Sequence, residues 1–272
     1  MNDSNHPQSA AGRTRLLSLC AVPLLAAMLP SAAFAQDAEA EAAEPLPEKQ
    51  PFFQLDLWDA YAELGINGSS GNNERLNLIA IGGIGRETVY METNFDALYT
   101  YATDEGDETE NRFLGTAGNT WLLPESKWRY YVRGLYELDE FQDWDYRIRL
   151  SGGVGYELID TDDTLFVLRA GAGVLREFGG EEDDWIPELN FGYDFEHKIN
   201  DRASIESIFD YYPRVDDFEE FRIEFSAGLK VDITDDGGLY LSAGILDQYD
   251  SDPGDGFDRN DIDYYVTLGA QF

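Results

Sequence analysis

Five arginines lie on the polar face of three successive segments in which polar and apolar residues alternate. They are the most chemically specific side chains in the sequence. Arg129 and Arg133 lie in one segment, Arg147 and Arg149 in the next, and Arg169 in the third. Carboxylates occupy the same phase on other segments, namely Glu63, Glu92, Asp96, Glu188, Asp194, Glu206, Asp210 and Glu224. Opposed rings of charge create a transverse field that selects permeating solutes. Two interpretations stay open, because such charges either line a passage or pair across it and fill it, as buried charges need partners.

The sequence offers little for nucleophilic or acid–base catalysis. Its single cysteine, Cys20, falls in a leader segment, so the rest of the chain has no thiol nucleophile, disulfide or cysteine metal ligand. The one histidine beyond that leader, His197, precedes a short turn and has no evident serine partner in strand register. A Ser-His-acid triad needs all three groups within hydrogen-bond reach. We therefore expect no enzyme, no catalytic residue and no cofactor, and interpret His197 as a solvated interfacial residue.

Runs of acidic residues at 181–184 and 250–255 raise the question of a calcium site. In the second run Gly254 stands where an EF-hand loop has its fifth-position ligand, and no glutamate follows at the twelfth position. Charge runs usually signal a solvated surface. We expect no specific metal site, with weak bridging of these loops to anionic lipid by divalent cations as a hypothesis.

The overall charge excludes one large class of partner. The 272 residues include 54 acidic and 19 basic side chains, which gives a formal net charge of −35. Such a polyanion is repelled by phosphate backbones, so we expect no binding to nucleic acid. The 16 tyrosines, 16 phenylalanines and 5 tryptophans are too many for a wholly disordered acidic chain.

The N-terminal region has the composition of a secretory leader and a tether. Basic residues at 13 and 15 precede an apolar run at 16–29 and an Ala-x-Ala site at 33–35, which predicts a signal peptide over 1–35. The apolar run is too short for a transmembrane anchor. Residues 36–52 are rich in Ala, Glu and Pro, and predict an acidic disordered linker.

From about residue 53 to the last residue, apolar and polar residues alternate with a period of two. One face of 57–67 carries Trp58, Ala60, Ala62, Leu64 and Ile66. The same phase recurs in 128–139, 146–157 and 221–231, with charged side chains on the opposite face. This pattern predicts strands with two chemically different faces. It is weak in 164–174, where Leu165 and Val167 stand at the polar phase.

Short turns and longer polar loops alternate between these strands. We expect short turns near 85–86, 124–127, 160–163, 200–202 and 234–237. The longer loops are 68–74, 102–111, 140–145, 179–184, 214–220 and 249–260. One hairpin therefore repeats about six times, which predicts about twelve antiparallel strands.

The chemistry of the two strand faces favours a membrane barrel over a soluble β-sandwich. A sandwich would bury its aliphatic faces and place its polar faces in water. Here the polar faces carry charges in mid-strand, and the apolar faces end in aromatic residues, as in outer-membrane barrels. We predict an all-β, transmembrane, antiparallel up-and-down barrel over residues 53–272, in contact with outer-membrane lipid and with the linker in the periplasm. The closing strand resembles the signal read by the barrel assembly machinery, through Tyr264, Val266, Leu268 and Phe272.

Several short motifs, in order, resemble those of a known family. They are Trp58 with Leu64-Gly65, Ser70-Gly71-Asn72, Asp145-Tyr146-Arg147, Gly152-Gly153-Val154-Gly155-Tyr156, Gly171-Ala172-Gly173, Tyr249-Asp250-Ser251-Asp252-Pro253 and the closing strand to Phe272. Over residues 55–272 the chain resembles the YdiY-like family of salt-induced outer-membrane proteins, a domain of unknown function. The resemblance implies an outer-membrane barrel and brings no established activity or catalytic residue.

These observations lead to three functional hypotheses. The first is a narrow passive channel for ions or small hydrophilic solutes, whose interior charges set its selectivity. The alternative is a closed barrel with a structural or surface-interaction role. The third is an outer-membrane hydrolase, which the position of His197 disfavours.

Overall fold

A computed structural model describes residues 48–71, 74–180, 183–254 and 256–272. The predicted signal peptide and the predicted linker as far as residue 47 lie outside the described residues. So do Asn72 of the family-like motifs and Glu181, Glu182 and Asp255 of the acidic loops.

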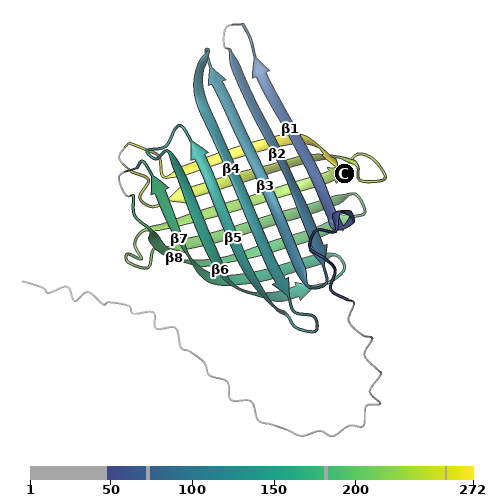
Figure 1. The fold of residues 1–272 in the computed structure, drawn as a ribbon. Coiled ribbons are helices and arrows are strands. Elements are labelled where there is room, and N and C mark those ends of the chain that lie inside the picture. Colours follow the sequence, from purple (N-terminus) through teal and green to yellow (C-terminus); the bar gives the residue numbers. More distant parts are fainter. Residues whose placement is uncertain (1–47, 72–73, 181–182, 255) are drawn as a thin grey trace, which may run out of the picture. The chain divides into compact units, whose positions relative to one another are not determined.

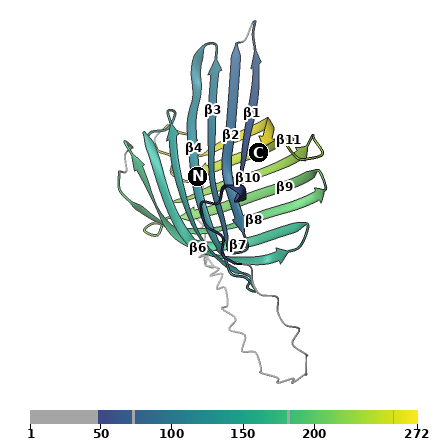
Figure 2. The ribbon, with the colours of Figure 1, turned by 45° about the vertical axis from the view of Figure 1, so that its right-hand side comes forward.

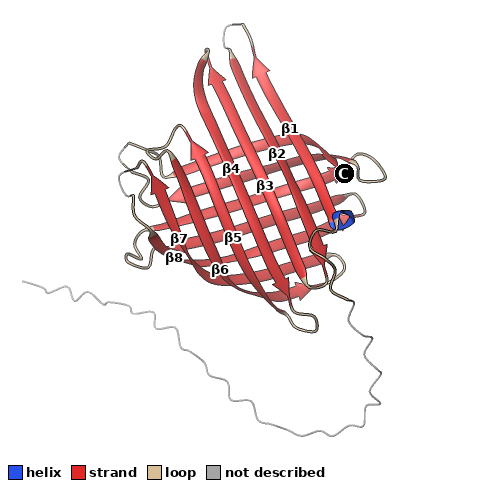
Figure 3. Ribbon diagram, in the orientation of Figure 1, coloured by secondary structure: helices blue, strands red, loops and turns tan. Residues whose placement is uncertain are grey.

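The chain from Trp58 onward forms a closed barrel of antiparallel strands in which each strand pairs with its neighbours in sequence and β1 closes onto β12 (Figures 1 and 3). The strands are β1 (Trp58–Ser69), β2 (Arg75–Thr88), β3 (Met91–Asp104), β4 (Asp107–Leu122), β5 (Trp128–Asp139), β6 (Tyr146–Asp160), β7 (Thr164–Phe178), β8 (Ile186–Asn200), β9 (Ala203–Pro213), β10 (Phe221–Asp232), β11 (Leu239–Asp250) and β12 (Asn260–Gln271). The predicted fold and the number of strands are thereby confirmed.

The two faces of the strands are separated as the alternation predicts. On the outer wall the apolar side chains are exposed: Tyr264 has 77% and Leu268 has 54% of its surface accessible. On the inner wall the charged side chains are enclosed, with Arg149 3% and Glu188 1% exposed. An apolar outside around a polar inside is the distribution of a transmembrane barrel. Within the part of the chain that the structure describes, no helix has the length and apolar character needed to cross a membrane.

The weakly alternating strand β7 carries apolar side chains into the lumen. Val167 and Leu175 are fully buried there. Room for Val167 comes from Gly155 on β6, where a Cβ atom would lie 3.1 Å from Val167 Cγ1 and 2.8 Å from Arg129 Cγ. Part of the lumen is therefore filled by packed side chains.

The short turn expected at Gly85-Arg86 is wrong, since both residues lie within β2. The chain reverses two residues later, between Thr88 and Met91, where the backbone N–H of Met91 donates to Thr88 Oγ1 over 3.1 Å. A threonine hydroxyl that bonds to nearby backbone closes this turn without glycine, and so no typical turn dipeptide marks it.

The long loop expected at 102–111 is also wrong. β3 and β4 run on to a two-residue turn at Glu105-Gly106, where φ is 56° and 91°. Positive φ at both central residues matches the twist of a hairpin. The acidic residues that suggested a loop are the ends of two strands, in a hairpin that extends at the top of Figure 1 together with β1–β2.

The closing seam between β1 and β12 is short. The paired residues run only from Tyr61↔Gln271 to Leu64↔Leu268, with a further pair of backbone hydrogen bonds between Ala60 and Phe272. Both strands continue beyond this ladder toward the loop end, and Figure 2 shows the β1–β2 hairpin rising away from the yellow β12. This seam therefore has the shortest ladder of backbone hydrogen bonds in the barrel wall.

Residues 48–57, here called the N-terminal strap, lie against the outer wall before β1. The strap ends in one 3₁₀ turn, η1 (Leu55–Leu57). The ring of Phe52 packs edge-on against Trp58 at 5.5 Å, and Trp58 Nε1 donates to the Phe52 carbonyl oxygen. The last residues of the predicted linker, 48–52, are thus in contact with the barrel.

Candidate functional site

All five predicted arginines lie in the lumen, on the adjacent strands β5, β6 and β7. Each forms ion pairs with carboxylates, so they do not form the free positive ladder that was one interpretation of the sequence. The alternation of the strands is what aims them inward, since residues two apart in a strand share a face.

At the loop end, Glu137 lies between two guanidinium groups. Its Oε1 accepts from Arg112 Nε at 2.6 Å and its Oε2 accepts from Arg147 Nε at 2.5 Å. Arg147 also stacks over Trp144 at 4.9 Å and lies 3.7 Å from Glu177. Glu137 is 1% exposed, and its two charged partners are what make burial of a carboxylate tolerable.

A second cluster joins β6 to β8 and β10. Arg149 Nη1 donates to Glu224 Oε1 over 2.6 Å, and Arg149 Nε lies 3.4 Å from Glu188 Oε2. Arg222 donates to Glu188 from the opposite side. The guanidinium of Arg149 also stacks on Tyr212 at 3.9 Å. These pairs reach across the lumen, because β6 and β10 lie four strands apart in the wall.

The third cluster lies beside the second and centres on Arg169. This side chain donates to Asp194 Oδ2 at 2.8 Å and to Asp210 Oδ1 at 2.7 Å. Arg133 on β5 reaches the same two carboxylates, at 3.2 Å and 3.7 Å. Asn190 Nδ2 donates over 2.8 Å to Asp210 Oδ1, which therefore accepts from both Asn190 and Arg169.

Arg129, near the short-turn end of β5, completes the set. It donates to Glu157 Oε1 at 2.5 Å and lies 3.6 Å from Glu92 Oε2 on β3. Ion pairs therefore hold Glu92, Glu188, Asp194, Asp210 and Glu224 of the eight predicted lumenal carboxylates.

The other three predicted carboxylates, Glu63, Asp96 and Glu206, have no arginine partner within the described part of the chain. Glu63 accepts from Tyr240 at 3.0 Å and from Thr267 at 2.5 Å, and Asp96 accepts from Tyr61 at 2.8 Å. Glu206 is exposed and shares the inward phase of Asp210 on β9. The lumen therefore holds carboxylate charge that no arginine neutralises.

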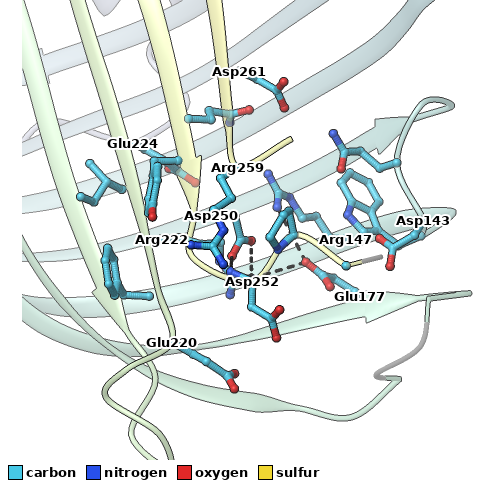
Figure 4. A pocket seen from close by; sticks show the side chains of 18 of the residues that line it. Asp143, Arg147, Glu177, Glu220, Arg222, Glu224, Asp250, Asp252, Arg259 and Asp261 are labelled. Carbon is cyan, nitrogen blue, oxygen red and sulfur yellow. Dashed lines mark hydrogen bonds and ion pairs between the residues drawn. The ribbon is translucent and has the colours of Figure 1, made fainter. Parts of the chain in front are cut away.

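A cavity of about 200 Å³ lies at the loop end of the barrel, where the ion-paired Glu137, Arg147 and Arg222 form part of its lining. Figure 4 shows Arg222 in its wall between Glu177 and Asp250, with Nη1 3.5 Å and 3.7 Å from their carboxylates. Loops from opposite sides of the barrel meet beside it, since a Cβ atom at Gly254 would lie 2.7 Å from Asp143 Oδ2. The mouth of the barrel is thereby narrowed.

The structure places the remaining candidates away from the lumen. His197 stands on the outer wall, where its Nδ1 is 2.9 Å from Thr164 Oγ1. The calcium hypothesis falls partly on Glu181, Glu182 and Asp255, which the structure does not describe. Among the described residues no group of three or more His, Cys, Asp or Glu side chains is arranged to hold a metal ion.

Three of the four residues of the predicted assembly signal share the outer face of β12, and the fourth, Phe272, directly follows that strand. Tyr264, Val266 and Leu268 are exposed on that face, and Phe272 pairs with Ala60 of β1 at the closing seam. Recognition by the assembly machinery stays a prediction.

Sequence reasoning missed several members of the lumenal network. Arg112 was not predicted because it directly follows the expected loop at 102–111, so the alternation assigns it to no strand face. Glu137, Glu157 and Arg222 were correctly assigned to the inward face but were not counted as part of the site. Glu177 lies on the weakly alternating β7, where the phase gave no clear signal.

Solved structures of several outer-membrane barrels are similar to this one. The KdgM porin in complex with disordered oligogalacturonate aligns at 10% identity with a TM-score of 0.40, covering 79% of this chain and 98% of that chain. The translocator domain of the autotransporter NalP from Neisseria meningitidis aligns at 11% identity and a TM-score of 0.44, with coverage of 79% and 88%. A FadL homologue of Pseudomonas aeruginosa aligns at 7% identity and a TM-score of 0.34, with coverage of 80% and 75%.

Comparison at the level of sequence gives a family without an assigned activity. The sequence matches that of no curated protein. The family model described as "Protein of unknown function, DUF481" matches residues 62–272, which include every strand but the first few residues of β1. The chain belongs to the DUF481 family of proteins of unknown function.

Proposed function

We propose that this protein is an outer-membrane channel that lets small cations pass passively through its lumen. The apolar outer wall supports a location in lipid, and the charged inner wall supports an aqueous path. Twelve strands stand between the filled barrel of eight and the open porin of about 16. The periplasmic position of the linker and the kinship with YdiY-like salt-induced proteins are part of the proposal.

The observation that carries the proposal is the excess of carboxylates in the lumen. Every predicted arginine is neutralised by a carboxylate, whereas Glu63, Asp96 and Glu206 face the lumen with no arginine beside them. The lumenal side chain of Ile208, near Glu206 on β9, is 42% exposed, so this part of the lumen is not filled. Carboxylate rings favour cations in channels.

The layer of cross-lumen ion pairs acts as the constriction. A solute must pass the buried clusters of Glu137, Arg149 and Arg169, so only ions and the smallest solutes fit. The same layer favours a second candidate function, a closed barrel with a structural role, because paired charges that span a lumen also block it.

Planar-bilayer recording of the refolded mature protein tests the proposal. Reproducible unitary current steps, from protein whose heat-modifiable gel mobility shows a folded barrel, are the expected result. A folded barrel that passes no current would favour the closed structural barrel. The proposal includes no enzymatic step, since His197 lies on the outer wall beside Thr164 rather than beside an acid.

A further inference from the structure

One arginine stands on the outer wall instead of in the lumen. Arg86 pairs in register with Trp58 of β1 and Thr93 of β3, so it shares their outward face. It is nevertheless only 3% exposed, because the N-terminal strap, including the ring of Phe52, covers it. A charged group in this position needs a compensating partner.

The strap satisfies Arg86 only in part. Its Nη2 lies 3.4 Å from the carbonyl oxygen of Gln50 and 3.2 Å from that of Pro51, and its guanidinium lies 5.7 Å from the ring of Phe52. Nε is enclosed and has no hydrogen-bond partner among the described residues. None of these contacts is with a carboxylate, in a chain whose net charge is −35. Among the described residues, the positive charge of Arg86 thus has no carboxylate partner.

A second unsatisfied donor lies in the same row of the wall. Thr93 pairs with Asn119 of β4, and Thr93 Oγ1 donates to Asn119 Oδ1 over 2.7 Å. The Nδ2 atom of Asn119 is enclosed and has no partner among the described residues. Arg86 and Asn119 therefore offer donors from either side of Thr93, the arrangement that an oxyanion accepts.

The row lies at the end of the barrel that carries the short turns and the C-terminus. Phe272 pairs with Ala60, two residues from Trp58, and Trp121 stands two residues from Asn119 with half of its side chain exposed. Trp58 also stacks on Phe95 at 6.3 Å. Aromatic residues of this kind mark the boundary between hydrocarbon and headgroups, where phosphate groups lie.

We propose that Arg86 and Asn119 bind the phosphate of a phospholipid in the leaflet at the short-turn end of the barrel. The phosphate reaches these enclosed donors by displacing the strap, and it then accepts from the Arg86 guanidinium and from Asn119 Nδ2, while the acyl chains lie along the apolar outer wall. Charge complementarity identifies the ligand, since an uncompensated arginine at a membrane boundary meets phosphate before any other anion. The site does not depend on conduction through the lumen.

Native mass spectrometry of the refolded mature protein in detergent micelles tests this inference. The probes are palmitoyl-oleoyl phosphatidylglycerol and dioleoylglycerol, which has acyl chains but no phosphate. Wild type is expected to retain the phosphatidylglycerol and not the diacylglycerol. Arg86→Gln should weaken retention by about tenfold, the effect of losing one charge-assisted contact. Asn119→Ala should weaken it less, and Arg176→Gln, an outer-wall arginine at the loop end, should leave it unchanged.

Further variants separate lipid binding from a role of Arg86 in holding the strap. Phe52→Ala loosens the strap but keeps the guanidinium, and should still retain phosphatidylglycerol. Equal losses in Phe52→Ala and Arg86→Gln would overturn the proposal, as would retention that Arg86→Gln does not change. Competition by soluble glycerol phosphate would show that the ligand is a free phosphate and contradict the lipid assignment. If Arg86→Gln fails to fold, Arg86→Lys takes its place. Lysine keeps the positive charge but lacks the paired N–H donors of the guanidinium, so this variant should show an intermediate loss of phosphatidylglycerol retention.

Discussion

Arg112 on β4 and Gln248 on β11 are joined by a hydrogen bond of 2.7 Å between Nη2 and Oε1. Five strand interfaces separate β4 from β11 by the shorter way around the wall, so this bond crosses the lumen. Through Nε the same guanidinium bonds to Glu137 on the neighbouring strand. Arg112 therefore ties two distant parts of the barrel wall to each other through its interior.

Removing the charge of Glu137 should destabilise the barrel strongly. Glu137→Gln leaves Arg112 and Arg147 buried without their shared counter-charge, a change that costs about 3–5 kcal/mol in buried networks. Urea unfolding of the protein in lipid vesicles measures the change in the free energy of unfolding. Glu140→Gln, in the exposed loop three residues away, is the matched control and should unfold like wild type. A stability loss no larger than that of the control would show that the network contributes little.

Removing a lumenal arginine should make the channel more selective for cations. Arg133→Ala removes one partner from Asp194 and Asp210, and Arg147→Ala removes one partner from Glu177 and Glu137. Reversal potentials in a KCl gradient should then shift further toward the potassium equilibrium potential. Arg176→Ala removes an arginine from the outer wall and should leave the reversal potential alone. Unchanged selectivity in both lumenal variants would remove the arginines from the selectivity mechanism.

The closing seam should be the part of the wall that opens most readily. The ladder between β1 and β12 ends at Leu64↔Leu268, so the amide of Tyr264 has no partner strand on the β1 side. Its N–H points to that side because it shares the phase of Phe272, which bonds to Ala60. Hydrogen exchange followed by NMR should find the amide of Tyr264 faster than that of Leu268. Equal protection of the two amides would mean that the seam closes further than the ladder shows.

The fold could be predicted from the sequence because period-two alternation and the position of the charges both depend on single strands. Lumen-facing Arg149 and lipid-facing Leu150 are neighbours in sequence, and one strand is enough to assign them to opposite faces. The turn after Thr88 could not be predicted, since it is closed by a side-chain hydrogen bond and not by a turn dipeptide.

The partners of the lumenal charges could not be predicted, for a different reason. Arg112 reaches Gln248 over 136 positions of sequence, and such a contact depends on how far the strands tilt and stagger around the barrel. Alternation identifies the inward face of each strand but not the height at which two side chains meet. The outward-facing Arg86 could not be predicted, because the sequence favoured a short turn at 85–86 and so assigned this residue to no strand face.

The reversal potential of single channels in a KCl gradient, for wild type and for Glu206→Gln, is the most direct test of a cation-conducting lumen. Glu206 faces the lumen without an arginine partner. The nearby cation is Lys230, whose ammonium group hydrogen-bonds to Gln271, so the exposed charge of Glu206 also acts on passing ions. Wild type should show unitary current steps whose reversal potential lies between zero and the potassium equilibrium potential. Glu206→Gln should move that reversal potential toward zero. Anion selectivity, or a folded barrel that passes no current, would contradict the proposed function.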